Sequence, residues 1–371
     1  MILGYKDPSV SRTEAGWKVE ILHEGKSVSR LWIVDRSMRV GAAVVTVGGI
    51  AGVGTDHEHR RRGLALRVLH WSLRLLQDEG YDASFLFGIA DYYDRVGFAT
   101  CFPEHGFAVD TRQAESVRSP LRTREMKPSD LPGIRTLYRR HNRLRTGSVV
   151  RSRAWTGFPM GSGWGISGIL RIVHARGAID RILGYVLYDD VSDGCRVAEV
   201  VGAGDDVNGA IALFLGRRAA ELRREWVTAS VPGDHPFAVF CRSLGYRDET
   251  RYPRCAGPMG RVIDVTRFLA ALAPELANRW PDDAPQQLSM RVDSDSITLT
   301  RRRRVVSVRA GAAGRRLKVA DSALLMQLAM GYRDADDATG ADLLVGSRGQ
   351  LELARALFPL RVAHMWWPDR F

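Results

Sequence analysis

Six consecutive residues, Arg60 to Ala65, combine positive charge with a glycine at the predicted start of a helix. Behind them, leucines recur at intervals of three and four residues, which predicts an amphipathic helix: Leu66, Leu69, Leu73 and Leu76. The unpaired N–H groups and the dipole of a helix start attract anions, and Gly63 lets a phosphate approach the backbone closely. Arg60–Ala65 therefore predicts an anion-binding turn, and the alternative is a solvated, arginine-rich helix start.

The neighbouring elements are predicted to position this turn. An apolar, β-rich segment, Ala42–Val53, precedes it, and Gly80 ends the helix that follows. Ala83–Phe87 then predicts a second strand. A strand, a basic glycine turn, a helix and a strand in this order form an arrangement suited to binding an anion.

These residues resemble the GCN5-related N-acetyltransferases (GNATs), which bind acetyl-coenzyme A (acetyl-CoA). The pattern R-x-x-G-x-A after a β-strand is similar to their pyrophosphate loop, and it lacks the Gly-Lys-Ser/Thr ending of a Walker loop. Val53–Thr55 lies before the pattern, where the family has a strand end. The segment Tyr93–Phe98, Tyr-x-Arg-x-Gly-Phe, follows at the distance found in the family. The resemblance implies an N-acetyltransferase with acetyl-CoA as its co-substrate.

The resemblance also implies where the coenzyme binds. In GNATs the coenzyme lies where two adjacent strands splay apart, and backbone N–H groups hold the thioester carbonyl oxygen. The residues predicted to bind it are Val53, Gly54, Thr55, Arg60, Arg61, Arg62, Gly63, Leu64 and Ala65. Those from Arg61 onward are expected to act mainly through main-chain N–H groups, with Arg60 adding charge. For Val53–Thr55, ordinary strand packing is the alternative.

Tyr93 is the predicted general acid. By the resemblance, the tyrosine two residues before Arg-x-Gly-Phe protonates the leaving thiolate of coenzyme A. The pKa of that thiol is about 8.5, and a phenol with a pKa near 10 can donate to it at close range. Tyr92 takes the role if the register is shifted by one residue. The alternative for Tyr93 is a tyrosine that packs a helix against the sheet.

Phe371, the last residue, is the predicted general base. Matches near both ends of the chain, including the terminal Trp366–Phe371, narrow the resemblance to the Eis-like (enhanced intracellular survival) subgroup. In these enzymes the carboxylate of the last residue enters the active site and takes the amine proton. An α-carboxyl has a pKa of about 3.5, so burial or a water relay must assist it. The alternative is an aromatic terminus docked in the core. Arg370 beside it disfavours a polycationic acceptor.

The sequence predicts an α/β (α+β) chain of three domains. Residues 1–115 form an N-terminal, acetyl-CoA-binding GNAT domain with a shortened start, because a predicted hairpin, Trp17–Val34, begins after only 16 residues. Residues 116–257 repeat the order of elements as a second GNAT-like, mixed-sheet domain. That copy is predicted to be degenerate, because Asp205 and Asp206 stand in the expected glycine turn Asp205–Gly209 and would repel a pyrophosphate.

Residues 258–371 are predicted to form the third domain. Met259–Val265 leads into a helix, Arg267–Leu276, and three strands and a further helix follow. This order resembles the sterol-carrier-protein-like domain of Eis-type proteins, and its end is expected to reach the active site. Between the motifs, residues 157–168 have a loop-like composition and carry no motif.

Composition bears on compartment and partners. The net charge is +12, and no apolar run reaches the length of about 18 residues that suggests a membrane span, so no membrane partner is expected. The chain lacks the pattern of a signal peptide, and the bacterial cytoplasm is the predicted compartment. The four cysteines form no C-x-x-C pair, and His57 and His59 lack a third ligand, so no metal site is predicted. The densest basic run, Arg301–Arg304, lacks interleaved aromatic residues, so nucleic-acid binding is not predicted.

Together these features predict a cytoplasmic, acetyl-CoA-dependent N-acetyltransferase. Its acceptor is a small-molecule or peptide primary amine, and aminoglycosides, polyamines and lysine side chains all remain open. The alternative is a non-catalytic carrier or regulatory protein whose C-terminal domain binds an apolar ligand; the intact glycine turn, Tyr93 and Phe371 speak against it. Because Eis-like proteins often form hexamers, the resemblance also implies a homo-oligomer.

Overall fold

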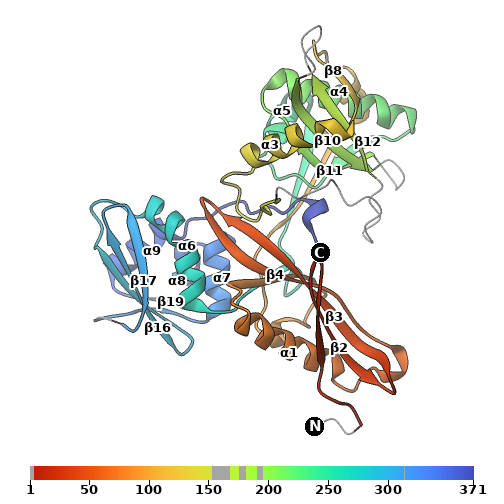
Figure 1. Cartoon of the computed structure of the whole chain (residues 1–371). Coiled ribbons are helices and arrows are strands. Elements are labelled where there is room, and N and C mark those ends of the chain that lie inside the picture. Colours follow the sequence, from red (N-terminus) through yellow and green to blue (C-terminus); the bar gives the residue numbers. More distant parts are fainter. Residues whose placement is uncertain (1–3, 153–167, 175–180, 190–194, 313) are drawn as a thin grey trace. The chain divides into compact units, whose positions relative to one another are not determined.

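The computed structural model describes residues 4–152, 168–174, 181–189, 195–312 and 314–371 (Figure 1). The described chain forms three β-sheets with helices packed on them, which confirms the predicted α/β class. It divides into two compact units. Unit 1 comprises Met1–Phe102, Tyr252–Ala363 and Phe371, and unit 2 comprises Pro103–Arg251 and His364–Arg370. Residues 157–167 of the segment without a motif lie outside the described residues.

The first sheet belongs to unit 1 and has the strand order β1-β2-β3-β4-β5-β14-β6. Its strands are β1 (Ser9–Thr13), β2 (Gly16–His23), β3 (Lys26–Val40), β4 (Ala43–Thr55), β5 (Ala83–Gly88), β6 (Ala99–Thr100) and β14 (Gly257–Val262). The predicted hairpin is confirmed: β2 and β3 are joined through Glu24 and Gly25, which both have positive φ, as a tight hairpin turn requires.

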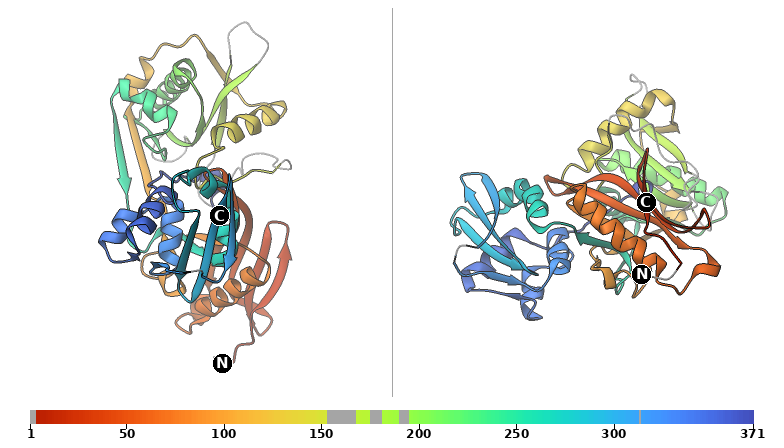
Figure 2. Two further views of the ribbon diagram at one scale, coloured as in Figure 1. Left: turned by 90° about the vertical axis from the view of Figure 1, so that its left-hand side faces the viewer. Right: turned by 60° about the horizontal axis from the view of Figure 1, so that its bottom comes forward.

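Helix α1 (Leu64–Asp78) covers one face of the first sheet, and Figure 2 shows it in orange along the strands. Its buried residues Leu64, Val68, Leu69 and Leu76 recur with the spacing of one helical face. The helix ends where predicted, because Gly80 takes a φ of +81° that favours glycine. The local apolar period and the closing glycine are therefore sufficient to define this helix.

The third sheet also belongs to unit 1, in the order β17-β16-β15-β18-β19. Its elements are β15 (Gln287–Val292), β16 (Asp295–Arg302), β17 (Val305–Ala310), β18 (Leu317–Val319), β19 (Leu344–Val345), α6 (Val265–Arg279), α7 (Ser322–Met330), α8 (Ala335–Gly340) and α9 (Arg348–Leu357). Helices α6 and α7 contact strands of both sheets in unit 1. Buried Glu275 of α6 accepts a hydrogen bond from the backbone N–H of Ala42, at 2.7 Å, which ties α6 to the turn between β3 and β4.

Unit 2 contains the second sheet, in the order β13-β7-β12-β11-β10-β9-β8. Its elements are β7 (Glu104–Asp110), β8 (Arg122–Glu125), β9 (Gly168–His174), β10 (Ile182–Asp189), β11 (Cys195–Val201), β12 (Trp226–Ala229), β13 (Tyr246–Arg251), α2 (Thr111–Glu115), α3 (Leu131–His141), α4 (Asp205–Glu221) and α5 (Pro236–Cys241). Separate apolar clusters join α4 and α3 to this sheet.

A buried ionic network fixes the segment His364–Arg370 within unit 2. The guanidinium of Arg151 donates to Asp369, at 2.9 Å, and to Glu199, at 3.0 Å. The hydroxyl of Tyr138 donates to Asp369, at 2.8 Å. Removing one partner of a buried pair costs about 3–5 kcal/mol, so this network holds the segment firmly.

The sheets cross the predicted domain boundaries. Strand β7, which precedes the predicted boundary at residue 115, pairs with β12 and β13 of the second sheet. Strand β14, predicted to open the third domain, pairs with β5 and β6 of the first sheet. Strand pairing over such distances leaves no local pattern in the sequence. None of the described helices is long and apolar enough to span a membrane.

One local prediction is corrected by the structure. Asp205–Gly209 is not a turn, because Asp205 and Asp206 already form the first turn of α4. The turn lies just before them, at Gly204, whose φ is +88°. Asp at the first helical positions is stabilised by the helix dipole, which explains the earlier helix start.

Candidate active site

Strands β4 and β5 part in the middle of the first sheet. Their parallel pairing ends at Gly49 opposite Phe85. Beyond this point, among the described residues, β4 pairs only with β3, and β5 only with β14. The edge of β4 that faces β5 is therefore open from Ile50 onward, and it includes the predicted strand-edge residues Val53, Gly54 and Thr55.

A β-bulge shapes the same part of β4. Ala51–Gly54 runs beside Arg30–Trp32 of β3 with one extra residue on β4. Gly52 has a φ of +58°, and a Cβ there would lie 2.7 Å from the Trp32 ring. Bulges redirect backbone groups and occur beside active sites. Here the bulge lies on the strand whose open edge would face a ligand.

The predicted pyrophosphate turn presents an uninterrupted run of free donors. The backbone N–H groups of Arg61 to Leu66 donate to no described residue, and the first helical hydrogen bond is that of Arg67 N–H to Gly63 C=O, at 3.1 Å. Gly63 precedes α1 with a φ of +71°. Consecutive free N–H groups beside a helix N-terminus form a concave anion site.

The three arginine side chains of the turn differ in their contacts. Arg60 donates to the carbonyl of Thr55, at 3.1 Å. Arg62 donates to the carbonyl of Glu58, at 3.3 Å, and to the hydroxyl of Tyr5, at 3.0 Å. The exposed side chain of Arg61 makes no hydrogen bond or ion pair with the described chain. Two arginines thus stabilise the turn, and one remains available to an anion.

The first turn of α1 contains no acidic residue, whereas that of α4 contains Asp205 and Asp206. Carboxylates at a helix start occupy the field that an anionic ligand would use. No acidic side chain therefore offsets the partial positive charge at the N-terminus of α1. In α4, Asp205 and Asp206 offset that charge.

Tyr93 lies beyond the end of β5 at Gly88 and directly precedes a 3₁₀ turn, Asp94–Val96. Its side chain is nine-tenths buried and packs against Gly88, where a Cβ would lie 2.8 Å from the ring. The hydroxyl makes no hydrogen bond with the described residues. Burial raises the pKa of Tyr93 above its usual value, so the phenol stays protonated at neutral pH. Tyr92 packs edge-on against Tyr93, with ring centroids 4.9 Å apart.

Phe371 lies at the point where β4 and β5 part. Its ring packs so closely on Gly49 that a Cβ there would be 2.6 Å from Cγ of the ring. The Phe87 ring of β5 meets it edge-on, at 5.9 Å between centroids. The last residue of the chain thus occupies the splay of the first sheet. Arg370 stacks on Trp367 in unit 2, and burial lowers the pKa of Arg370 to about 10, so it stays charged at neutral pH.

Tyr93 and Phe371 lie on opposite faces of the first sheet. A Cβ on Gly48 would meet Leu76 of α1, whereas a Cβ on Gly49 would meet Phe371. Neighbouring residues of a strand point to opposite faces, so Phe371 lies on the face away from α1. Tyr93 belongs to the apolar cluster beneath α1. The two side chains therefore border the end of β5 from its two sides.

Two residues of this arrangement were not predicted. Gly49 lies in an apolar strand, where a glycine indicates close approach of another group. That signal does not show that the approaching group is the far end of the chain. Tyr5, near the start of the chain, is hydrogen-bonded to the predicted pyrophosphate turn, and nothing in its sequence neighbourhood indicates this contact.

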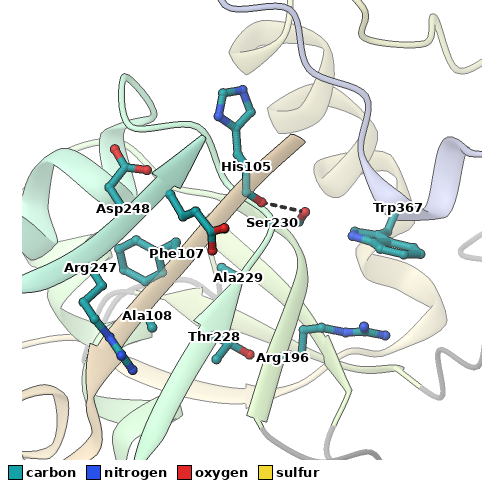
Figure 3. A pocket seen from close by; sticks show the side chains of 12 residues that line it. His105, Phe107, Ala108, Arg196, Thr228, Ala229, Ser230, Arg247, Asp248 and Trp367 are labelled. Atoms are coloured by element: carbon teal, nitrogen blue, oxygen red, sulfur yellow. Dashed lines mark hydrogen bonds between the residues drawn. The ribbon is translucent and has the colours of Figure 1, made fainter. Parts of the chain in front are cut away.

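A separate cavity of about 680 Å³ lies in unit 2, and Figure 3 shows it. On the strands that line it, Arg247 of β13 lies opposite Ala108 of β7, Ala108 lies opposite Thr228 of β12, and Thr228 lies opposite Arg196 of β11. Small residues in the middle of this row create the hollow, and the arginines at its ends stack on indoles of Trp226 and Trp367. None of the predicted site residues lines this cavity.

Comparison with known proteins agrees with the geometry of unit 1. Residues 6–101 match the family model described as Acetyltransferase (GNAT) domain. Among curated protein sequences, none matches the chain significantly. The match spans β1 to β6, including the splay and the predicted pyrophosphate turn. The chain therefore carries a GNAT acetyltransferase domain and is an N-acetyltransferase.

Three solved structures share the fold. A conserved protein of Enterococcus faecalis V583, described as a probable N-acyltransferase, is 16% identical with a TM-score of 0.79, over 96% of this chain and 89% of that one. A GCN5-related N-acetyltransferase from Anabaena variabilis ATCC 29413 is 18% identical with a TM-score of 0.77, over 95% and 89%. Eis1 from Mycobacterium abscessus is 20% identical with a TM-score of 0.64, over 96% and 91%.

Proposed function

We propose that this chain transfers the acetyl group of acetyl-CoA to a primary amine at the splay of the first sheet. The observation that carries the proposal is the run of free N–H groups from Arg61 to Leu66, at a helix start without acidic residues and beside the open edge of β4. A pyrophosphate fits such a site, because it satisfies several donors and the helix dipole together.

In this proposal Arg60 stabilises the turn through its hydrogen bond to the Thr55 carbonyl, and the other predicted residues bind the coenzyme. Arg61–Ala65 hold the pyrophosphate through main-chain N–H groups, and the free side chain of Arg61 adds charge. The open edge formed by Val53, Gly54 and Thr55 orients the acyl group. Bound acetyl-CoA supplies the acetyl group as a thioester, and its transfer to the amine releases the coenzyme thiol. The half-buried rings of Phe371 and Phe87 near Gly49, and the buried ring of Tyr93 near Gly88, limit the access of water to the splay.

Proton transfer is assigned to Tyr93 and Phe371. The Tyr93 hydroxyl donates its proton to the sulfur as the carbon–sulfur bond breaks. The raised pKa keeps this phenol protonated before the step. The terminal carboxylate of Phe371 takes the proton that the amine loses as the amide bond forms. One group therefore gives a proton on one face of the sheet, and the other accepts a proton on the opposite face.

The acceptor class is proposed as a primary amine on a small molecule or a peptide. The sterol-carrier-like assignment of residues 258–371, the domain boundaries and the homo-oligomer stay predictions, and the roles above do not depend on them. A thiol-release assay with acetyl-CoA and a panel of aminoglycosides, polyamines and lysine peptides would identify the acceptor.

Gly63 offers a direct test of the coenzyme site. Both Asp and Asn tolerate the left-handed conformation that Gly63 adopts, but only Asp adds a charge. We expect Gly63→Asp to abolish acetyl-CoA binding in calorimetry, because its carboxylate would enter the anion site. Gly63→Asn should retain weakened binding. If both variants bind as the wild type does, the turn is not the site.

A further inference from the structure

The hydroxyl of Tyr5 joins the start of the chain to the predicted pyrophosphate turn. It accepts a hydrogen bond from the guanidinium of Arg62, at 3.0 Å, and lies 2.7 Å from Nδ1 of His59. Because a guanidinium can only donate, the Tyr5 O–H is left to donate to Nδ1 of His59. One hydroxyl therefore links two positions of the turn, on either side of Arg60 and Arg61.

Tyr5 is itself held firmly. Its ring is 7% exposed and belongs to the apolar cluster beneath α1. Arg67, in the first turn of α1, donates to the Tyr5 carbonyl, at 3.3 Å, and to the carboxylate of Asp7, at 2.5 Å. The ring of His23 packs on that of Tyr5, at 4.9 Å between centroids. The segment Tyr5–Asp7 is thus hydrogen-bonded both to the turn and to the first turn of α1.

The turn needs such support because Arg61 is strained. Arg61 has a φ of +59°, a left-handed conformation that is unfavourable for a residue with a side chain. Such residues persist where their surroundings determine the backbone. The neighbours Arg60 and Arg62 are both tethered, Arg60 to Thr55 and Arg62 to Tyr5 and Glu58. Of these tethers, only the bond to Tyr5 comes from outside the segment from Thr55 to Arg62.

We infer that Tyr5 is a positioning residue that holds the turn in its coenzyme-binding conformation before the coenzyme arrives. The inference rests on the proposed function, because it assigns this turn to acetyl-CoA. Tyr5 acts through Arg62 and His59 and does not itself touch the pyrophosphate. Losing its hydroxyl should free the turn to relax, so that binding must first restore the conformation. The chemistry at the splay would be unaffected.

The test compares Tyr5→Phe with Tyr81→Phe. Each removes one hydroxyl from a buried tyrosine of the same apolar cluster, but Tyr81 bonds to Trp17 and Asp35, away from the turn. We expect Tyr5→Phe to raise the Kd and KM for acetyl-CoA about five- to tenfold, the loss of roughly one hydrogen bond. The kcat at saturating acetyl-CoA should stay within about twofold, as for a loss of uniform binding. Tyr81→Phe should leave both constants unchanged.

A double-mutant cycle with Arg62→Gln tests the route of the effect. If Tyr5 acts through Arg62, the double variant should bind acetyl-CoA no worse than the weaker single variant. Unchanged affinity in Tyr5→Phe, or full additivity with Arg62→Gln, overturns the inference. An equal loss in Tyr81→Phe also overturns it, because the effect would then be general destabilisation. If the wild type does not bind acetyl-CoA, the proposed function fails instead.

Discussion

Gly49→Ala should separate the role of Phe371 from its packing. The backbone of Gly49 is conventional, so alanine fits the strand, but its Cβ would lie 2.6 Å from Cγ of the Phe371 ring. Carbon atoms pack at about 3.5–4.0 Å, so the ring must retreat by about 1 Å or more. Overpacking a rigid core costs about 1–3 kcal/mol. Phe371 lies outside any helix or strand, however, and can move aside more cheaply than β4 can bend.

Displacing the ring also displaces the terminal carboxylate. A misplacement of about 1 Å at a reacting group can lower the rate about 100-fold. We therefore expect kcat/KM of Gly49→Ala to fall about 100-fold for a good amine acceptor, with little change in melting temperature. The Kd for acetyl-CoA should change little, because the pyrophosphate turn is untouched. A thiol-release assay and calorimetry on the same preparation measure these quantities.

Gly48→Ala is the matched control. Its Cβ would lie 2.3 Å from Cδ2 of Leu76, on the face covered by α1. This variant should lose stability, on the order of 1–3 kcal/mol, and keep its activity below the melting temperature. Wild-type kcat/KM in Gly49→Ala would refute the role assigned to the Phe371 carboxylate. An equal loss of activity in both variants while they are folded would also refute that role, because the loss would then follow damage to β4.

Three further predictions follow from charge and burial. Calorimetry should give one acetyl-CoA per chain, because Asp205 and Asp206 occupy the start of α4; a stoichiometry of two would contradict this. As pH rises, kcat/KM should rise because the amine deprotonates. Since burial raises the pKa of Tyr93, kcat/KM should not decrease again until the pH exceeds about 10. A decrease in kcat/KM at lower pH that Tyr93→Phe abolishes would exclude a raised pKa. Burial is the main reason that the pKa of His141 is lowered to about 4. The charge of Arg145 also lowers this pKa, and its effect is larger than the opposite effect of Asp234. The unfolded state therefore binds more protons between about pH 6.5 and 4, and stability falls with falling pH in that window by up to about 3 kcal/mol. Urea unfolding should show a slope of this sign, and it should become shallower in His141→Gln without vanishing, because burial also lowers the pKa of His235 and His364.

The predictable parts of the fold are those encoded by neighbours in sequence. Helix α1 follows from a leucine period and Gly80, and the β2–β3 hairpin follows from alternation around Glu24 and Gly25. The turn at Gly63 is also formed by a few neighbouring residues, and its binding of an anion stays a prediction. Local periodicity and backbone preference are sufficient for such elements, because their stabilising contacts are short in sequence.

The parts that could not be predicted depend on contacts between distant segments. Strand β14 completes the first sheet from beyond residue 250, and its sequence is that of any buried strand. Phe371 was assigned by resemblance alone, and only the structure shows that Gly49 leaves room for its ring. The anchoring of the turn by Tyr5 likewise depends on a single hydroxyl, which no pattern of charge or apolar period reveals.

The two strand–turn–helix arrangements differ in the way expected if unit 1 has the proposed anion site and unit 2 lacks one. At the start of α4, Asp205 and Asp206 each stabilise the helix, by about 0.3–1 kcal/mol when exposed. Helix α1 forgoes that stabilisation, and its turn holds Arg61 in an unfavourable conformation with free donors around it. The missing acidic residues and the unfavourable conformation of Arg61 both occur in unit 1, which also contains the splay of β4 and β5 and the last residue of the chain. A helix start that lacks such stabilisation is expected at a site for an anionic ligand. The bound anion would supply the missing stabilisation, and this contributes to the affinity for the ligand.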